Sequence, residues 1–234
     1  MTEYTEVGIP DLQPFFWPWM GKEYRQRLLE QNASSPRIHL MAESHYSKET
    51  PDPSWTVDAV RELALAQNKF GAFWTKAIQI VERKPGCELD RLAAWNRVAY
   101  SNFIQDNLHE NRKAPNSEMW ERGRRTFFAQ LALTRPSILI VLGKRLFAQL
   151  PNEGMRIPGP LREQPDSAPV EDAWLYPHDV EGERILTLAV CVTHPSGGGF
   201  QWETASGRAW SAISHYSSIA TAYRNGTFSK PVRN

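Results

Sequence analysis

The stretch Ala189-Val190-Cys191-Val192-Thr193-His194-Pro195-Ser196-Gly197-Gly198-Gly199-Phe200 joins a strand-like apolar run to an abrupt polar turn. Proline cannot extend a strand ladder, and consecutive glycines let a backbone approach a ligand closely. In open α/β sheets, ligands bind in the crevice formed by the loops after the strands. We therefore expect His194 to point into such a crevice. A glycine-rich turn with a capping serine is the alternative interpretation.

Along the rest of the chain, apolar runs typical of strands alternate with segments that have the apolar spacing of helices. The strands are predicted at 37–42, 97–103, 137–142 and 185–192, and the main helical segments at 21–31, 57–82 (one or two helices), 117–133 and 203–223. Ser117 is the expected cap of the third of these helices, and a short helix is expected over 144–150. The alternation predicts a three-layer α/β/α sandwich with a central four-stranded parallel sheet and helices on both faces.

Length and composition predict one soluble domain over residues 1–234. Residues 1–20 form an aromatic arm, and the proline-rich segment 151–183 is expected to be a long surface excursion. The net charge of +1 means that any nucleic-acid binding must come from a local patch. The two cysteines have neither disulfide nor metal spacing, and Cys191 is expected to be a buried free thiol.

No membrane span or signal peptide is recognised, so a cytoplasmic location is expected. No cofactor, metal or obligate protein partner is expected.

Two loops resemble motifs of the uracil-DNA glycosylase superfamily. His194-Pro195-Ser196 resembles the second motif of that superfamily, and the loop after the first strand resembles its water-activating loop. The latter reads Gly-Gln-Asp-Pro-Tyr in one branch and Gly-Glu-Ala-Pro-Gly in another. When the loop is aligned with these two motifs, Ala42 stands at the position of the first glycine and Glu43 at the polar second position. Ser44, His45 and Tyr46 occupy the three positions that follow. The aspartate of the uracil-specific branch is absent, so Glu43 is the candidate carboxylate.

The resemblance extends from about residue 37 to residue 223 and implies roles for the strand-end residues. Glu43 would orient water and stabilise the positive sugar, and His194 would stabilise the departing base. Asn102 would read the edge of the extruded base, and Phe103 or Tyr46 would stack on its face. The alternatives are a capping role for Glu43, a turn role for Asn102 and a solvated loop position for His45.

The glycine loop is the expected DNA contact. The amides of Ser196, Gly197, Gly198 and Gly199 would hold phosphates, and Phe200 or Gln201 would act as the wedge that keeps the base extruded. Lys144 and the nearby Arg145, with Arg122, Arg124 and Arg125, could lie beside the groove. A solvated helix face explains these basic residues equally well, and Phe200 could instead pack beneath the last helix.

The resemblance implies a DNA glycosylase, and a monofunctional one is expected because neither motif loop contains a lysine that could form a Schiff base. Its expected partner is DNA with a flipped base. The altered water loop favours a modified pyrimidine, such as the glucosylated hydroxymethylcytosine that some phage-defence members of the superfamily excise. A glycosylase for uracil or other deaminated bases, and a non-catalytic nucleic-acid-binding α/β module, are the alternatives.

Overall fold

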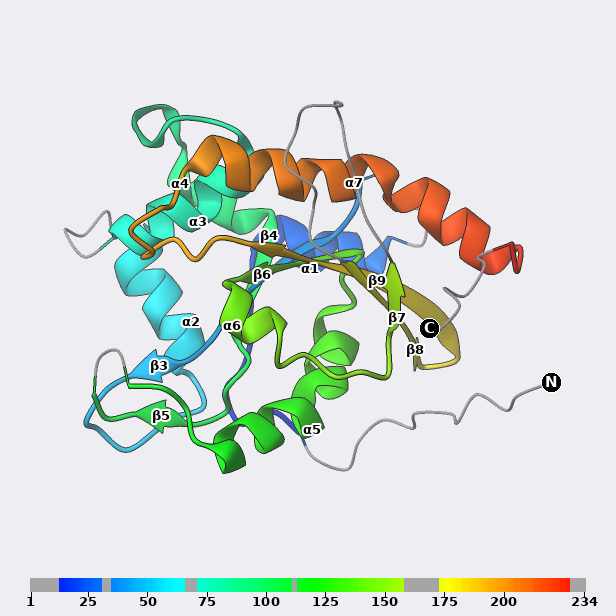
Figure 1. Cartoon of the computed structure of the whole chain (residues 1–234). Helices are drawn as coiled ribbons and strands as arrows, with labels where there is room; N and C mark the ends of the chain where they lie inside the picture. Colours follow the sequence, from blue (N-terminus) through cyan, green and yellow to red (C-terminus); the bar gives the residue numbers. More distant parts are fainter. Residues whose placement is uncertain (1–12, 31–34, 66–70, 111–112, 158–172, 228–234) are drawn as a thin grey trace.

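The centre of the molecule is a seven-stranded sheet in the order β1-β4-β2-β6-β9-β8-β7 (Figure 1). The computed structural model describes residues 13–30, 35–65, 71–110, 113–157 and 173–227. The strands of the sheet are β1 (Trp19–Met20), β2 (Ile38–Ala42), β4 (Val98–Asn102), β6 (Ile138–Leu142), β7 (Met155–Ile157), β8 (Ala173–Val180) and β9 (Glu183–Val192). A separate two-stranded ribbon pairs β3 (His45–Tyr46) with β5 (Asn107–Leu108).

The four predicted strands are neighbours and run parallel, as expected. β4 pairs with β2, β2 with β6, and β6 with β9, all in parallel register. The predicted number of four strands is too low, because antiparallel strands extend both edges. β1 pairs with β4 at one edge, and β8 and β7 follow β9 at the other.

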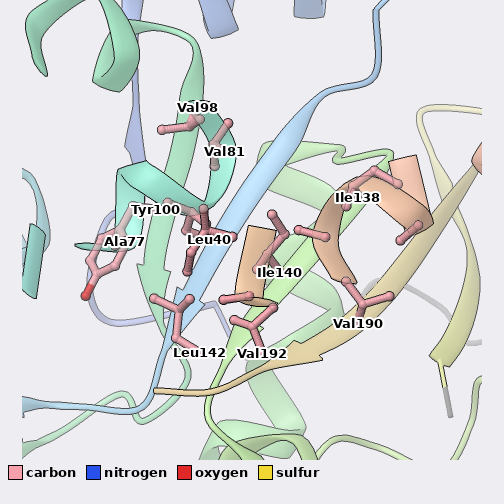
Figure 2. Close-up of a cluster of buried hydrophobic side chains, with 14 of the residues drawn as sticks. Leu40, Ala77, Val81, Val98, Tyr100, Ile138, Ile140, Leu142, Val190 and Val192 are labelled. Atoms are coloured by element: carbon pink, nitrogen blue, oxygen red, sulfur yellow. The ribbon is translucent and has the colours of Figure 1, made fainter. Parts of the chain in front are cut away.

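The parallel strands are apolar on both faces because helices cover both. Successive side chains of a strand point to opposite faces. Leu40, Ile140 and Val190 therefore belong to one hydrophobic cluster (Figure 2), and Met41 and Leu139 belong to the other. This two-sided burial accounts for the unbroken apolar runs in the sequence.

The helices form the outer two layers (Figure 1). α3 (Ala72–Glu82), α4 (Arg91–Asn96) and α7 (Trp202–Arg224) pack on the cluster of Figure 2, and α5 (Ser117–Thr134) packs on the opposite cluster. The three-layer prediction is therefore confirmed. The remaining elements are α1 (Lys22–Leu29), α2 (Trp55–Ala59), the π-helix η1 (Val60–Leu65), the 3₁₀ helix η2 (Gly86–Glu88) and α6 (Lys144–Phe147).

Two local expectations are corrected. The helical region expected over 57–82 begins earlier, at Trp55, and comprises α2, the π-helical η1 and α3, with 66–70 outside the described residues. The cap of α5 is Asn116, not Ser117, because the Asn116 side chain accepts a hydrogen bond from the Met119 amide at 2.8 Å.

The interpretation of 151–183 as a surface excursion was wrong, since the segment supplies β7 and β8 to the sheet. Residues 158–172 lie outside the description. Proline suggested a loop, but Pro177 sits in β8 beyond the end of β7, where β8 is an edge strand. Edge strands tolerate proline. In the expected arm, residues 1–12 are outside the description, Phe16 is buried, and Trp19–Met20 form β1.

The order of the parallel strands creates a switch point between β2 and β6. From β2 the chain continues to β4 on one side, and from β6 it continues to β9 on the other. Open α/β sheets bind ligands at the carboxyl ends of strands where the order reverses. Among the described residues, no helix is long and apolar enough to cross a membrane.

Candidate functional site

A cavity of about 1020 Å³ opens at the carboxyl edge of the sheet, beside the switch point. Its described lining includes nine residues that the sequence singled out, namely Ala42, Glu43, Ser44, His45, Tyr46, Asn102, Arg145, His194 and Ser196. They follow the ends of β2, β4, β6 and β9, so parallel strand pairing is what brings them together. The expected convergence of Glu43, Asn102 and His194 on one cavity is therefore met.

Glu43 is buried and paired. Its backbone carbonyl accepts from the Ile104 amide at 2.9 Å, which fixes the loop after β2 against the loop after β4. Its carboxylate receives two hydrogen bonds from the Arg145 guanidinium, one of them from Nε to Oε2 at 2.7 Å. Arg145 belongs to α6, directly after β6, so this ion pair bridges the switch point. The pair holds the carboxylate in a fixed orientation.

The ring of His194 is oriented by its own turn. The Ser196 amide donates to His194 Nδ1 at 3.1 Å, so Nδ1 is an acceptor and the proton of a neutral ring sits on Nε2. Burial lowers the pKa of His194, the Arg145 charge lowers it further, and the Glu43 charge opposes both. The imidazole is therefore neutral near pH 7, with one N–H available as a donor.

Two neighbours hold the His194 ring from other elements. The Phe73 ring on α3 lies 5.6 Å from it between centroids. Gly143 begins the loop after β6 with a φ of 124°, and a Cβ there would lie 3.5 Å from His194. This positive φ favours glycine, and it lets the loops after β6 and β9 run close together.

Asn102 is almost completely buried at the end of β4, yet it lines the cavity. Its Oδ1 accepts a hydrogen bond from the Tyr100 hydroxyl at 3.4 Å. Burial raises the pKa of Tyr100, so the phenol stays protonated and remains a donor. With Oδ1 engaged by Tyr100, the Asn102 amide N–H groups are the part available to a ligand.

The loop after β2 differs in part from its expected form. His45 is not a solvated loop residue, because its Nε2 hydrogen-bonds to Thr56 Oγ1 at 2.8 Å and its ring packs edge-on against Phe16. Burial lowers its pKa to about 4. Ser44 lines the cavity, and its Oγ is buried with no hydrogen-bond partner among the described residues. His45 therefore supports the loop, and Ser44 is free to meet a ligand.

Of the two expected stacking residues, only Tyr46 reaches the cavity. Tyr46 is exposed in β3 and lines the cavity. Phe103 is fully buried on the opposite face of the sheet, where it packs against Trp120 and Phe127 of α5. The prediction for Phe103 was wrong, because the chain turns after Asn102 and sends the next side chain into the α5 layer.

The glycine loop uses two of its expected phosphate-binding amides internally. The Ser196 amide serves His194, and the Gly197 amide donates to the His194 carbonyl at 2.8 Å. Those two amides are therefore not free for phosphate, in contrast to the expectation. Gly198 and Gly199 are exposed, and a Cβ on either would meet nothing within 4 Å.

The candidate wedge residues, Phe200 and Gln201, and the basic candidate Lys144 differ in how they pack. The Phe200 side chain packs against the core cluster, and Lys76 Nζ lies 5.5 Å from its ring centroid. Gln201 is exposed directly before α7, which favours it over Phe200 as a wedge. Lys144 is exposed on α6 next to Arg145 and outside the cavity lining.

Sequence reasoning missed one wall of the cavity. α2 and η1 supply Trp55, Asp58, Ala59, Glu62 and Leu63, and α3 adds Phe73 and Trp74. Their helical spacing indicated only a core-facing helix. The available signal was the charge on that segment, because Asp58 and Glu62 are one turn apart. With Glu43 and Glu49 they give the described lining four carboxylates against one guanidinium.

Comparison of the chain with protein-family models and with curated proteins finds no match. Within the described ranges, no group of three or more His, Cys, Asp or Glu side chains could hold a metal ion. The site is therefore interpreted from its own residues.

Proposed function

We propose that the protein is a monofunctional DNA glycosylase that hydrolyses the N-glycosidic bond of a modified pyrimidine and leaves an abasic site. The observation that carries this proposal is the meeting of Glu43, Asn102 and His194 on one cavity at the switch point. A carboxylate, a base-reading amide and a neutral imidazole donor are the groups that this reaction needs. The partial match to the glycosylase motifs adds to it.

His194 acts on the leaving base. When the bond from C1′ to the base nitrogen breaks, its electron pair moves onto the pyrimidine and raises the negative charge at O2. The Nε2–H of His194 donates to that oxygen, and the Ser196 amide keeps the donor on Nε2. A fixed donor that strengthens its bond as charge develops lowers the barrier, as an oxyanion hole does.

Glu43 acts on the sugar and the water. Its negative charge stabilises the positive sugar that forms as the base leaves. A water held between the carboxylate and Ser44 Oγ adds to C1′, and its proton passes to Glu43. Ser44 fits this role because its hydroxyl is buried without a partner among the described residues.

The size and lining of the cavity support a base with a bulky, uncharged substituent. Its volume of about 1020 Å³ lies at the top of the roughly 300–1,000 Å³ typical of sites for drug-sized ligands. Trp55 offers an apolar face, and Glu62 offers acceptors to hydroxyl groups, whereas the oxygens of Asp58 already accept from Ser54 and Arg61. A hexose such as that of glucosylated hydroxymethylcytosine has both features, whereas an anionic substituent would be repelled.

A panel of DNAs tests the proposal. The protein is incubated with DNA that contains uracil, hydroxymethylcytosine or glucosylated hydroxymethylcytosine, and released bases are identified by mass spectrometry beside an assay for alkali-labile sites. We expect release of the glucosylated base. Release of uracil alone would instead assign the repair alternative, and DNA binding without abasic sites would assign the non-catalytic module.

A further inference from the structure

The Arg145 guanidinium is hydrogen-bonded to the Glu43 carboxylate, which the proposed reaction needs. Both oxygens of Glu43 accept from this guanidinium, through Nε and Nη2. A guanidinium so placed occupies both carboxylate oxygens, which a water would otherwise approach, and offsets the negative charge that would stabilise a positive sugar. In the free protein, Glu43 is therefore held in position and masked at the same time.

The two partners differ in their access to solvent. The Glu43 side chain is 10% exposed, whereas that of Arg145 is 53% exposed. The Glu43 backbone is also fixed by the Ile104 amide. Arg145 can therefore turn outward while Glu43 stays in place.

Arg145 is also the one cationic side chain in the described lining of a cavity that carries four carboxylates. A DNA strand that brings a nucleotide into this cavity meets repulsion from those carboxylates. A phosphodiester accepts a guanidinium through two oxygens in the same geometry as a carboxylate does. The DNA backbone and Glu43 are therefore competing partners for Arg145.

We propose that Arg145 is a substrate-operated positioning residue: the phosphodiester beside the flipped nucleotide takes the guanidinium from Glu43 and frees the carboxylate to activate water. This inference rests on the proposed glycosylase function. It adds that the carboxylate becomes active only when a DNA backbone is present. A free nucleoside with the same base is therefore a poor substrate, because it has no phosphate to exchange.

The test removes the phosphate charge from the substrate and the guanidinium from the protein, singly and together. Single-turnover excision is measured on oligonucleotides that carry one neutral methylphosphonate linkage, placed in turn at each phosphate flanking the target base. At one position we expect the rate of the unmodified protein to fall roughly ten- to hundredfold, the scale of a lost charge-assisted hydrogen bond. In Arg145→Gln the same linkage causes no further loss.

Two further variants address folding and charge. Arg145→Gln/Glu43→Gln removes both charges, so it leaves no unpaired buried carboxylate if the single variant fails to fold. We expect it to bind DNA with a salt dependence reduced by about one phosphate contact. Arg145→Lys keeps the charge but not the two-pronged geometry, and it should recover part of the sensitivity to the methylphosphonate.

Arg184→Gln is the matched control, since Arg184 is equally exposed and paired with Asp179 near the amino end of β9, at the opposite edge of the sheet. It should retain the full methylphosphonate effect. Equal sensitivity of the unmodified protein and Arg145→Gln at every linkage would overturn the exchange. If the unmodified protein releases no base from any DNA, the glycosylase proposal itself fails, and the exchange fails with it.

Discussion

At the scale of single residues, the amide of Ser196 decides which nitrogen of His194 carries the proton. Because Nδ1 accepts that amide, a neutral ring can donate only from Nε2. The packing of Phe73 and the close approach of Gly143 then limit where the ring can lie. The chemistry proposed for His194 depends on this turn as much as on the imidazole.

His194→Ala removes the donor to the leaving base. Excision should slow by roughly a hundredfold to a thousandfold, the cost of about 3–4 kcal/mol expected for a lost oxyanion donor. DNA binding should survive, because backbone contacts rather than this ring hold the strand. Single-turnover excision measured beside a DNA-binding assay checks both. Equal losses of binding and excision would mark His194 as structural.

Glu43→Gln keeps the size of the side chain but removes its charge. Turnover should fall by roughly two or more orders of magnitude, as for a lost general base. DNA affinity should not decrease, since the substitution releases Arg145 from its carboxylate partner. Steady-state turnover and equilibrium binding are the measurements. Near-normal turnover would assign the role to another carboxylate of the cavity, with Asp58 and Glu62 the next to be replaced.

At the scale of elements, the sequence predicted the strands that are buried on both faces and missed those at the edges. The β6 run is apolar throughout, which is the pattern of a central strand that is buried on both faces. β1 has two residues and β8 contains a proline, so neither shows a strand pattern. β1 pairs with β4, which is distant in the chain, so local periodicity does not reveal it. β8 pairs with β9 across the two-residue turn Glu181-Gly182, a local pairing that the proline in β8 obscured.

The same limit applies to the site. The motif positions Glu43 and His194 could be predicted because each directly follows a strand whose apolar run is clear. Arg145 follows a strand as well, but its pairing with Glu43 requires that β2 and β6 be neighbours. The wall from α2 and η1 depends on a π-helical stretch, and no residue pattern in 57–82 distinguishes that from an ordinary core helix.

Two helical glycines give opposite predictions at this scale. Glycine to alanine in a helix usually stabilises by roughly 0.5–1 kcal/mol. In α5, however, a Cβ at Gly123 would lie 2.5 Å from a ring carbon of buried Phe103. Gly123→Ala should therefore destabilise, whereas Gly207→Ala in α7, where a Cβ meets nothing within 4 Å, should stabilise. Urea unfolding of both variants checks the signs, and stabilisation by Gly123→Ala would show that α5 can shift away from the sheet.

At the scale of the whole molecule, burial lowers the pKa of four of the six histidines, and they lie in different parts of the fold. His39 on β2 hydrogen-bonds to Thr134 of α5 and Ser101 of β4, and its pKa falls to about 3. The pKa of His45 falls to about 4. The pKa values of His178 on β8 and His194 after β9 are lowered as well.

These four groups predict a fold that loses stability in mild acid. An unfolded histidine titrates near pH 6.5, whereas these remain neutral in the folded protein until the pH is well below that value. Below about pH 6.5 the unfolded chain therefore binds more protons than the folded one, and the free energy of unfolding falls as the pH falls. Each such histidine contributes a slope of up to about 1.4 kcal/mol per pH unit, and for His39 the loss continues to about pH 3. Urea unfolding at intervals from pH 7.5 to 4.5 measures the slope, and His39→Gln should make it shallower by about one proton. A free energy of unfolding that does not change from pH 7 to 5 would mean that these histidines bind protons over the same pH range in the folded protein as in the unfolded chain.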